Sequence, residues 1–102
     1  VYRTLMENKH NVFLLDIKRD SYDDLKSFLL NHSIDLVFNL VHGEGGEDGK
    51  IQNYLDDIDI KYCGSDSQSS YLSFNKLKTK EIWREHNLIT PDFEIYSDQS
   101  YE

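Results

Sequence analysis

The chain has 102 residues, which is enough for one small domain. Its 11 Lys and Arg residues against 19 Asp and Glu residues leave a formal net charge of −8, which disfavours binding to nucleic acid or to an anionic membrane surface. A single cysteine excludes an internal disulfide framework and a cysteine-rich zinc site. No apolar run approaches the roughly 20 residues that span a bilayer, and no signal-peptide pattern is visible, so a soluble, cytoplasmic protein is expected.

The first third of the chain contains two candidate helices with an apolar run between them. Helical spacing of apolar side chains predicts a helix over residues 1–10. The run at residues 12–17 predicts a strand buried on both faces, because such strands lose the alternation of apolar and polar residues. Asp20 and Ser21 are candidate N-caps of a second helix, whose apolar side chains recur at helical spacing through His32.

The middle of the chain has the same alternation of elements. Residues 34–41 contain a second apolar run, which again predicts a buried strand. Residues 42–49 hold four of the five glycines and predict a loop. An amphipathic helix is expected over residues 51–58 and a short strand over residues 60–63, where Cys63 is predicted to be a small buried residue.

The last third begins with two candidate helix starts. Ser65 and Gln68 have the spacing of a capping box, which predicts a short helix after Ser65. Asn75 is a candidate N-cap for a helix that continues to about Asn87. A final strand is expected over residues 93–96, after the only proline of the chain.

Alternating strands and helices predict an α/β domain. Its sheet is expected to be mostly parallel, with helices on both faces and right-handed crossovers between strands. Ligands of such domains bind at the carboxyl ends of the strands, so the loop at 42–49 is the candidate ligand site. Its glycines allow backbone N–H groups to approach a ligand, and His42 can carry or share a proton near neutral pH.

From the residues alone, three other interpretations of this loop stay open. The glycines and acids may do no more than make a tight turn and cap the next helix. A metal could bind four of the side chains, His42, Glu44, Glu47 and Asp48, although their spacing matches none of the usual metal motifs. A phosphate-binding loop is the third interpretation, but the spacing of the common glycine-rich phosphate motifs is absent.

The literal sequence of the loop, His-Gly-Glu-Gly-Gly-Glu-Asp-Gly, resembles the signature of the D-alanine–D-alanine ligases of the ATP-grasp superfamily. Four further segments resemble that family in the same order: Gly49–Leu55, Ile60–Ser65, Ser69–Lys76 and Trp83–Pro91. The resemblance covers about residues 36–93. Departures from the family pattern fall at Asn53, Phe74, Asn75 and Asn87.

The resemblance implies a three-layer, Rossmann-like pre-ATP-grasp domain over residues 1–75, truncated at its N-terminus and lacking its first strand. Residues 76–102 would lead into an absent ATP-grasp domain. The implied activity joins two D-alanines, with ATP and Mg²⁺, through an acylphosphate, and serves peptidoglycan precursor synthesis. D-lactate or D-serine as the second substrate is an alternative within the family. A non-catalytic ligand-binding or interaction module of the same fold is an alternative outside it.

The resemblance also implies roles for individual residues. His42 and Glu47 would be the catalytic residues, at the site of the first D-alanine. The implied substrate-binding residues are His42, Gly43, Gly45, Gly46 and Glu47. Lys76 would contact the phosphates of the nucleotide, while ATP and Mg²⁺ would be held mainly by the absent domains and no metal ligand is expected in this chain. The full-length protein would be a homodimer.

The chain does not begin with Met, and it opens within a predicted helix, so a fragment of a longer ligase is expected. We predict that the isolated 102 residues have no ligase activity and are poorly stable or associate, because a missing first strand leaves strand edges unpaired. The measurement is ATP-dependent formation of D-Ala-D-Ala by the isolated chain. Detectable dipeptide would contradict the prediction.

Overall fold

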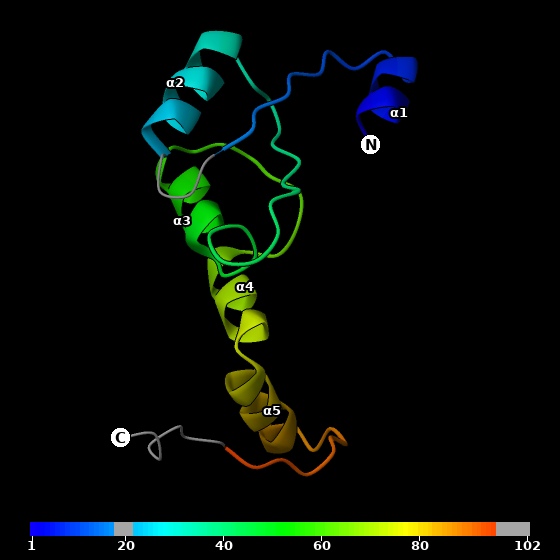
Figure 1. Ribbon diagram of the computed structural model, residues 1–102, viewed down its shortest axis with the longest axis vertical. Coiled ribbons are helices and arrows are strands. Elements are labelled where there is room, and N and C mark those ends of the chain that lie inside the picture. Colours follow the sequence, from blue (N-terminus) through cyan, green and yellow to red (C-terminus); the bar gives the residue numbers. More distant parts are fainter. Residues whose placement is uncertain (18–21, 96–102) are drawn as a thin grey trace, which may run out of the picture.

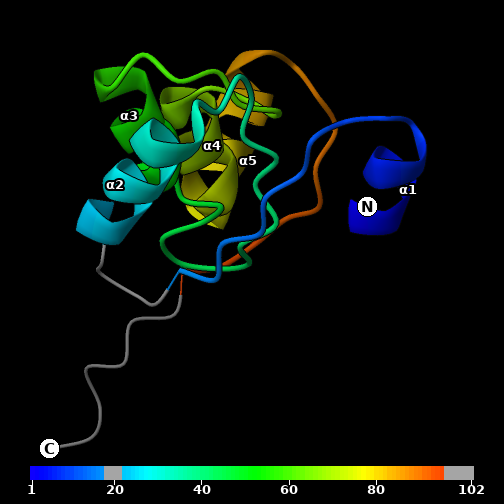
Figure 2. The same cartoon turned by 90° about the horizontal axis from the view of Figure 1, so that it is seen from above.

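The computed structural model describes residues 1–17 and 22–95. Five helices are formed in this part of the chain: α1 (Tyr2–Glu7), α2 (Tyr22–His32), α3 (Lys50–Asp57), α4 (Ser67–Phe74) and α5 (Lys76–Glu85). Helices α3, α4 and α5 follow one another along the long axis, α2 lies beside α3, and α1 stands apart from the others (Figures 1 and 2). None of these five helices is long and apolar enough to cross a membrane.

The core of the molecule lies between α2 and α3. Leu25 and Leu29 of α2 are buried against Ile51 and Leu55 of α3. Each pair is spaced four residues apart, which places both members on the same face of their helix. Eight partly buried residues surround this cluster: Ile17, Tyr22, Ile34, Val37, Tyr54, Ile58, Ile60 and Tyr62. The two predicted amphipathic helices are therefore confirmed, and they bury each other's apolar faces.

Two tyrosines extend the contact between α2 and α3. The rings of Tyr22 and Tyr54 are stacked, with their centroids 5.0 Å apart. The hydroxyl of Tyr54 donates a hydrogen bond of 2.9 Å to the carbonyl oxygen of Tyr22. Burial raises the pKa of Tyr54, and the nearby carboxylate of Asp23 raises it further, so the hydroxyl stays a donor over the physiological range.

One pair of residues in the described chain is bridged as in a parallel sheet. Val37 is bridged to Tyr62: its N–H donates to the carbonyl of Lys61 at 2.8 Å, and its carbonyl accepts from the N–H of Cys63 at 2.9 Å. This single bridge is parallel, the orientation expected of most of the sheet. The complete parallel sheet, however, stays a prediction.

The burial expected for the apolar runs at 12–17 and 36–41 is not observed. Leu14 is 70% exposed and Leu40 is 57% exposed. Ile17 and Val37 are partly buried against the core, and within residues 1–17 and 22–95 Val37 is the one residue of these runs that forms a β-bridge. Residues 93–95 likewise form no regular element, and Tyr96 lies outside the described residues.

The helix boundaries show which capping predictions hold. Asn75 caps α5 as predicted, because its side chain accepts a hydrogen bond from the N–H of Lys78 at 3.1 Å. The capping box at Ser65 is wrong: Asp66 is the N-cap of α4 and accepts from the N–H of Ser69 at 2.7 Å.

A charged carboxylate is an effective cap, because it also interacts favourably with the positive end of the helix dipole. The backbone N–H of Ser69 accordingly holds the pKa of Asp66 below its ordinary value. Asn87 follows α5 with a φ of 56°, in the left-handed region that often ends a helix. The predicted caps of α2, Asp20 and Ser21, lie outside the described residues.

We predict that Leu55→Ala destabilises the chain strongly. Leu55 is fully buried, with 0% of its surface exposed, so truncation leaves a cavity between α2 and α3. The expected loss is about 2–5 kcal/mol. Because the isolated chain is expected to have little stability to spare, this loss should abolish its cooperative unfolding transition in urea. The matched control is Leu14→Ala, which should change stability by less than about 0.5 kcal/mol. Equal losses in the two variants would contradict the location of the core.

Candidate functional site

The glycine-rich loop connects the extended segment that ends at Val41 with the first turn of α3, as predicted (Figure 1). It lies directly on the chain that precedes it. A Cβ atom at Gly46 would clash with the carbonyl oxygen and the side chain of Val41, so only glycine permits this close approach. Gly43 and Gly45 have φ angles of 76° and 86°, which side-chain-bearing residues rarely adopt. The backbone path of the loop therefore depends on its glycines.

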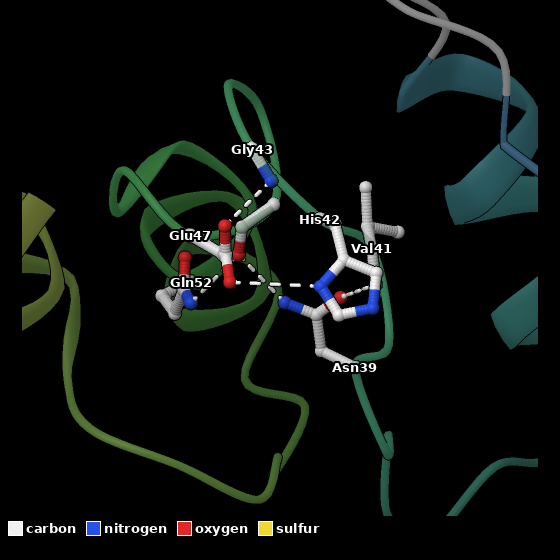
Figure 3. A network of polar contacts seen from close by, with 7 residues as sticks. Asn39, Val41, His42, Gly43, Glu47 and Gln52 are labelled. Atoms are coloured by element: carbon white, nitrogen blue, oxygen red, sulfur yellow. Dashed lines mark hydrogen bonds and ion pairs between the residues drawn. The ribbon is translucent and has the colours of Figure 1, made fainter.

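Glu47 holds the loop closed. Its Oε2 atom accepts a hydrogen bond of 2.6 Å from the N–H of Gly43, and its own N–H donates to the carbonyl of Gly43 at 2.9 Å. Its other carboxylate oxygen, Oε1, lies 3.7 Å from Nδ1 of His42, and Figure 3 shows the two groups facing each other. The structure thus brings together the two residues that the resemblance assigns to catalysis.

The pair of His42 and Glu47 is open to solvent. The side chain of His42 is 90% exposed and that of Glu47 is 53% exposed. An ion pair with this exposure contributes little to stability, because water screens it. Both groups are therefore accessible to a ligand.

Two amide side chains donate hydrogen bonds to the backbone of the loop. Nδ2 of Asn39 donates to the carbonyl of Gly46 at 2.8 Å, and Nε2 of Gln52 donates to the same oxygen at 3.2 Å. Oδ1 of Asn39 accepts from the N–H of Val41 at 2.9 Å. Neither residue is among the site residues that the sequence predicts. A polar Asn39 within an apolar run was the signal that could have found the first of them.

A cavity of about 260 Å³ lies beside the loop. Six of the residues that line it are His42, Gly46, Glu47, Gln52, Cys63 and Ser70. The cavity is open to solvent on one side, and its volume is just below the range of roughly 300–1,000 Å³ typical of enclosed ligand pockets. Gly46, His42 and Glu47 therefore line the same cavity.

Cys63 is exposed, so the prediction that it is a small buried residue is wrong. Its neighbour Tyr62 packs against the core. Because side chains of an extended chain alternate between opposite sides, Cys63 points away from the core.

Lys76 is not brought to this cavity. It is the first residue of α5 and is exposed, and α4 lies between it and the loop (Figure 1). Lys76 is therefore not among the residues that line the loop cavity.

The remaining acids of the loop have a structural role. Asp48 is 9% exposed, and its Oδ1 accepts from the N–H of Lys50 at 3.2 Å while its Oδ2 lies 3.3 Å from Nζ of Lys50. Nζ of Lys50 also donates to Glu44 Oε1 at 2.9 Å. Asp48 thus accepts from the first N–H of α3, although the N-cap residue of this helix is Gly49, which has no side chain to cap it. No group of three or more His, Cys, Asp or Glu side chains in residues 1–17 and 22–95 is placed to hold a metal ion.

These contacts shift two ionisable groups. Burial by itself raises the pKa of Asp48, but hydrogen bonds from the backbone N–H groups of Gly45 and Lys50 and from the Lys50 ammonium outweigh it, and the net pKa is lowered. The pKa of Lys50 is raised, mainly because its ammonium donates to Glu44 and then to Asp48. Asp48 is thus held in its charged form.

We predict that Asp48→Asn destabilises the folded chain at neutral pH. Because folding lowers the pKa of Asp48 below its ordinary value of 3.8, the stabilisation is fully present above that value. It is lost as the pH falls through the lower pKa of the folded state. Unfolding free energies of the two proteins should therefore differ at pH 7 and converge toward pH 2. The matched control Asp35→Asn changes an exposed carboxylate, and a similar effect there would contradict the prediction.

Comparison with known proteins gives the site its context. Residues 3–65 match the family model described as the D-ala D-ala ligase N-terminus. The chain is 43% identical over 79 residues to the D-alanine–D-alanine ligase of Saccharophagus degradans, covering 78% of this chain and 24% of that protein. It is 36% identical over 103 aligned residues to that of Desulforamulus reducens, covering 100% of this chain and 32% of that protein. The chain thus spans a quarter to a third of these relatives' length, and it belongs to the D-alanine–D-alanine ligase family, whose N-terminal domain it matches.

Proposed function

We propose that this chain is the N-terminal, substrate-binding part of a D-alanine–D-alanine ligase that makes peptidoglycan precursors. The observation that carries the proposal is the loop cavity, where the carboxylate of Glu47 is fixed 3.7 Å from the imidazole of His42. The loop sequence belongs to the segment that matches the family model. A cavity of about 260 Å³ with accessible acid and imidazole groups suits a small, polar ligand such as an amino acid.

The proposed reaction requires positioning more than a protein nucleophile. A carboxylate oxygen of the first D-alanine attacks the γ-phosphorus of ATP, and ADP leaves. The free amine of the second D-alanine then attacks the acyl carbon, the acyl–oxygen bond breaks, phosphate leaves with the electron pair, and the amine nitrogen gives up one proton to phosphate or water. His42 would orient the first D-alanine by hydrogen bonding, and Glu47 would hold the loop and face a cationic group.

Lys76 is proposed to contact the phosphates of the nucleotide, since an ammonium group is a compact positive charge that suits a phosphate oxygen. It lies outside the loop cavity, at the start of α5. Mg²⁺ would neutralise phosphate charge in such a reaction. Since no suitable ligand cluster lies within residues 1–17 and 22–95, we propose that its ligands belong to other parts of the ligase.

We also propose the predicted architecture for the complete ligase. Residues 1–75 would form a three-layer, Rossmann-like domain, and residues 76–102 would lead into the ATP-grasp domain. The parallel bridge between Val37 and Tyr62 supports a parallel sheet, and the exposed apolar runs at 12–17 and 36–41 would be buried by further strands. The resemblance alone supports a cytoplasmic homodimer.

The test is a chimaera in which this chain replaces the aligned segment of the Desulforamulus reducens ligase, of which it covers 32%. We expect ATP-dependent formation of D-Ala-D-Ala and release of phosphate. In this chimaera His42→Gln should lower kcat/KM for D-alanine by about 100-fold, because the glutamine amide cannot place its hydrogen-bonding atoms where the imidazole nitrogens orient the substrate. His10→Gln, at an exposed position outside the loop, is the matched control and should have no effect.

Each result of this experiment has a definite meaning. A folded chimaera that makes no product would contradict the proposal and favour a non-catalytic module. Product formed only with D-lactate or D-serine as the second substrate would identify the alternative ligase. A chimaera that does not fold would contradict the claim that these residues can replace the N-terminal domain of a relative.

A further inference from the structure

The peptide unit between Gly46 and Glu47 is held at both of its polar groups. Its carbonyl oxygen accepts two hydrogen bonds, from Asn39 Nδ2 at 2.8 Å and from Gln52 Nε2 at 3.2 Å. Its N–H donates to the carbonyl of Gly43 at 2.9 Å. Because a peptide unit is planar, contacts at both groups fix the direction in which the Cα atom of Glu47 is presented.

The two amides reach this carbonyl from different elements. Asn39 belongs to the extended segment before the loop and Gln52 to the first turn of α3, and Figure 3 shows them approaching from two sides. Oδ1 of Asn39 accepts from the N–H of Val41 at 2.9 Å, so its NH₂ group is the one that faces Gly46. The loop is thus fastened to both of the elements that it connects.

The buried position of Gln52 makes an amide side chain there unfavourable in free energy. The residue is 8% exposed, and its Oε1 has no hydrogen-bond partner in the described part of the chain. Leaving a buried acceptor unpaired costs free energy that an apolar side chain of similar size would avoid. The contact that an apolar side chain could not make is the hydrogen bond to Gly46.

The peptide unit between Gly46 and Glu47 leads directly to the side chain of Glu47, which faces His42. Glu47 accepts from the N–H of Gly43 at 2.6 Å through one oxygen, and its other oxygen lies 3.7 Å from His42 Nδ1. The close approach of Gly46 to Val41 leaves the peptide little room on that side. The carboxylate of Glu47 thus belongs to the residue whose preceding peptide unit the two amides hold.

We propose that Asn39 and Gln52 are positioning residues that set the Glu47 carboxylate against His42 and thereby tune the affinity of the loop cavity for D-alanine. The proposal rests on the proposed function. Neither residue is assigned a chemical step: both act through the carbonyl of Gly46. Gln52 also lines the cavity, and its amide donates to the carbonyl of Gly46 in the loop.

The test uses Asn39→Asp and Gln52→Glu in the chimaera. Each substitution keeps the size of the side chain but replaces the donating NH₂ group with an oxygen that repels the carbonyl of Gly46. We expect KM for D-alanine to rise roughly 10- to 100-fold, since small displacements of positioning groups have effects of this size. KM for ATP should stay within about twofold, because Lys76 lies outside the cavity. Asn11→Asp, at an exposed position, is the matched control and should change neither constant.

A pH series separates positioning from a general structural effect. At low pH the carboxyl group introduced by Gln52→Glu becomes protonated and can again donate to Gly46. Its KM for D-alanine should then approach that of the parent chimaera measured at the same pH. Gln52→Met has a similar length and no donor at any pH, so its KM should not recover; it also serves as the folded variant if a charged substitution prevents folding.

The outcomes distinguish this proposal from the proposed function. If the parent chimaera is folded but makes no product, the proposed function is overturned, and this inference with it. If the parent is active and the folded variants keep the parent KM for D-alanine, the positioning role alone is overturned. Equal rises of both KM values, or a loss of kcat with unchanged KM values and no recovery at low pH, would also overturn it in favour of a purely structural role.

Discussion

The packing of Leu25 and Leu29 on Ile51 and Leu55 is the contact on which the rest of the structure depends. It joins α2 to α3 and so fixes where the glycine-rich loop must end. Tyr22, on the first turn of α2, reinforces this by donating from its hydroxyl to the carbonyl of Gly45 at 3.2 Å. A small apolar cluster thus helps to position a polar loop whose residues Gly46, Asp48 and Gly49 are themselves buried.

The loop divides its acidic residues between two tasks. Asp48 is buried at the start of α3, where backbone N–H groups and the Lys50 ammonium keep it charged. Glu47 is half exposed, closes the loop through Gly43 and presents its second oxygen to His42. The two neighbouring acids therefore differ in their surroundings. Asp48 is hydrogen-bonded to the start of α3, whereas Glu47 lines the cavity. The amides of Asn39 and Gln52 hold the peptide that connects these two environments.

Sequence patterns predicted some features well because their causes are local. Asn75 was identified as an N-cap, since the capping bond joins residues three apart. The capping box at Ser65 failed, because Asp66 competes for the same N–H groups and carries a charge. Cys63 was expected to be buried, but the side of the chain on which it lies follows from Tyr62 packing into the core. Helical spacing predicted α2 and α3, whereas the expected sheet is represented in the described residues by the bridge of Val37 and Tyr62.

The sequence by itself determined the amphipathic helices, the glycine-rich loop and the ligase family, because each of these follows from spacing over a few residues or from a literal motif. It also singled out His42 and Glu47, although not their separation of 3.7 Å. Only the tertiary structure decided that the amides of Asn39 and Gln52 meet at the carbonyl of Gly46. These residues are seven and six positions from Gly46, and they meet because the loop folds back between an extended segment and a helix that the core holds in place. No periodic pattern encodes a contact of that kind.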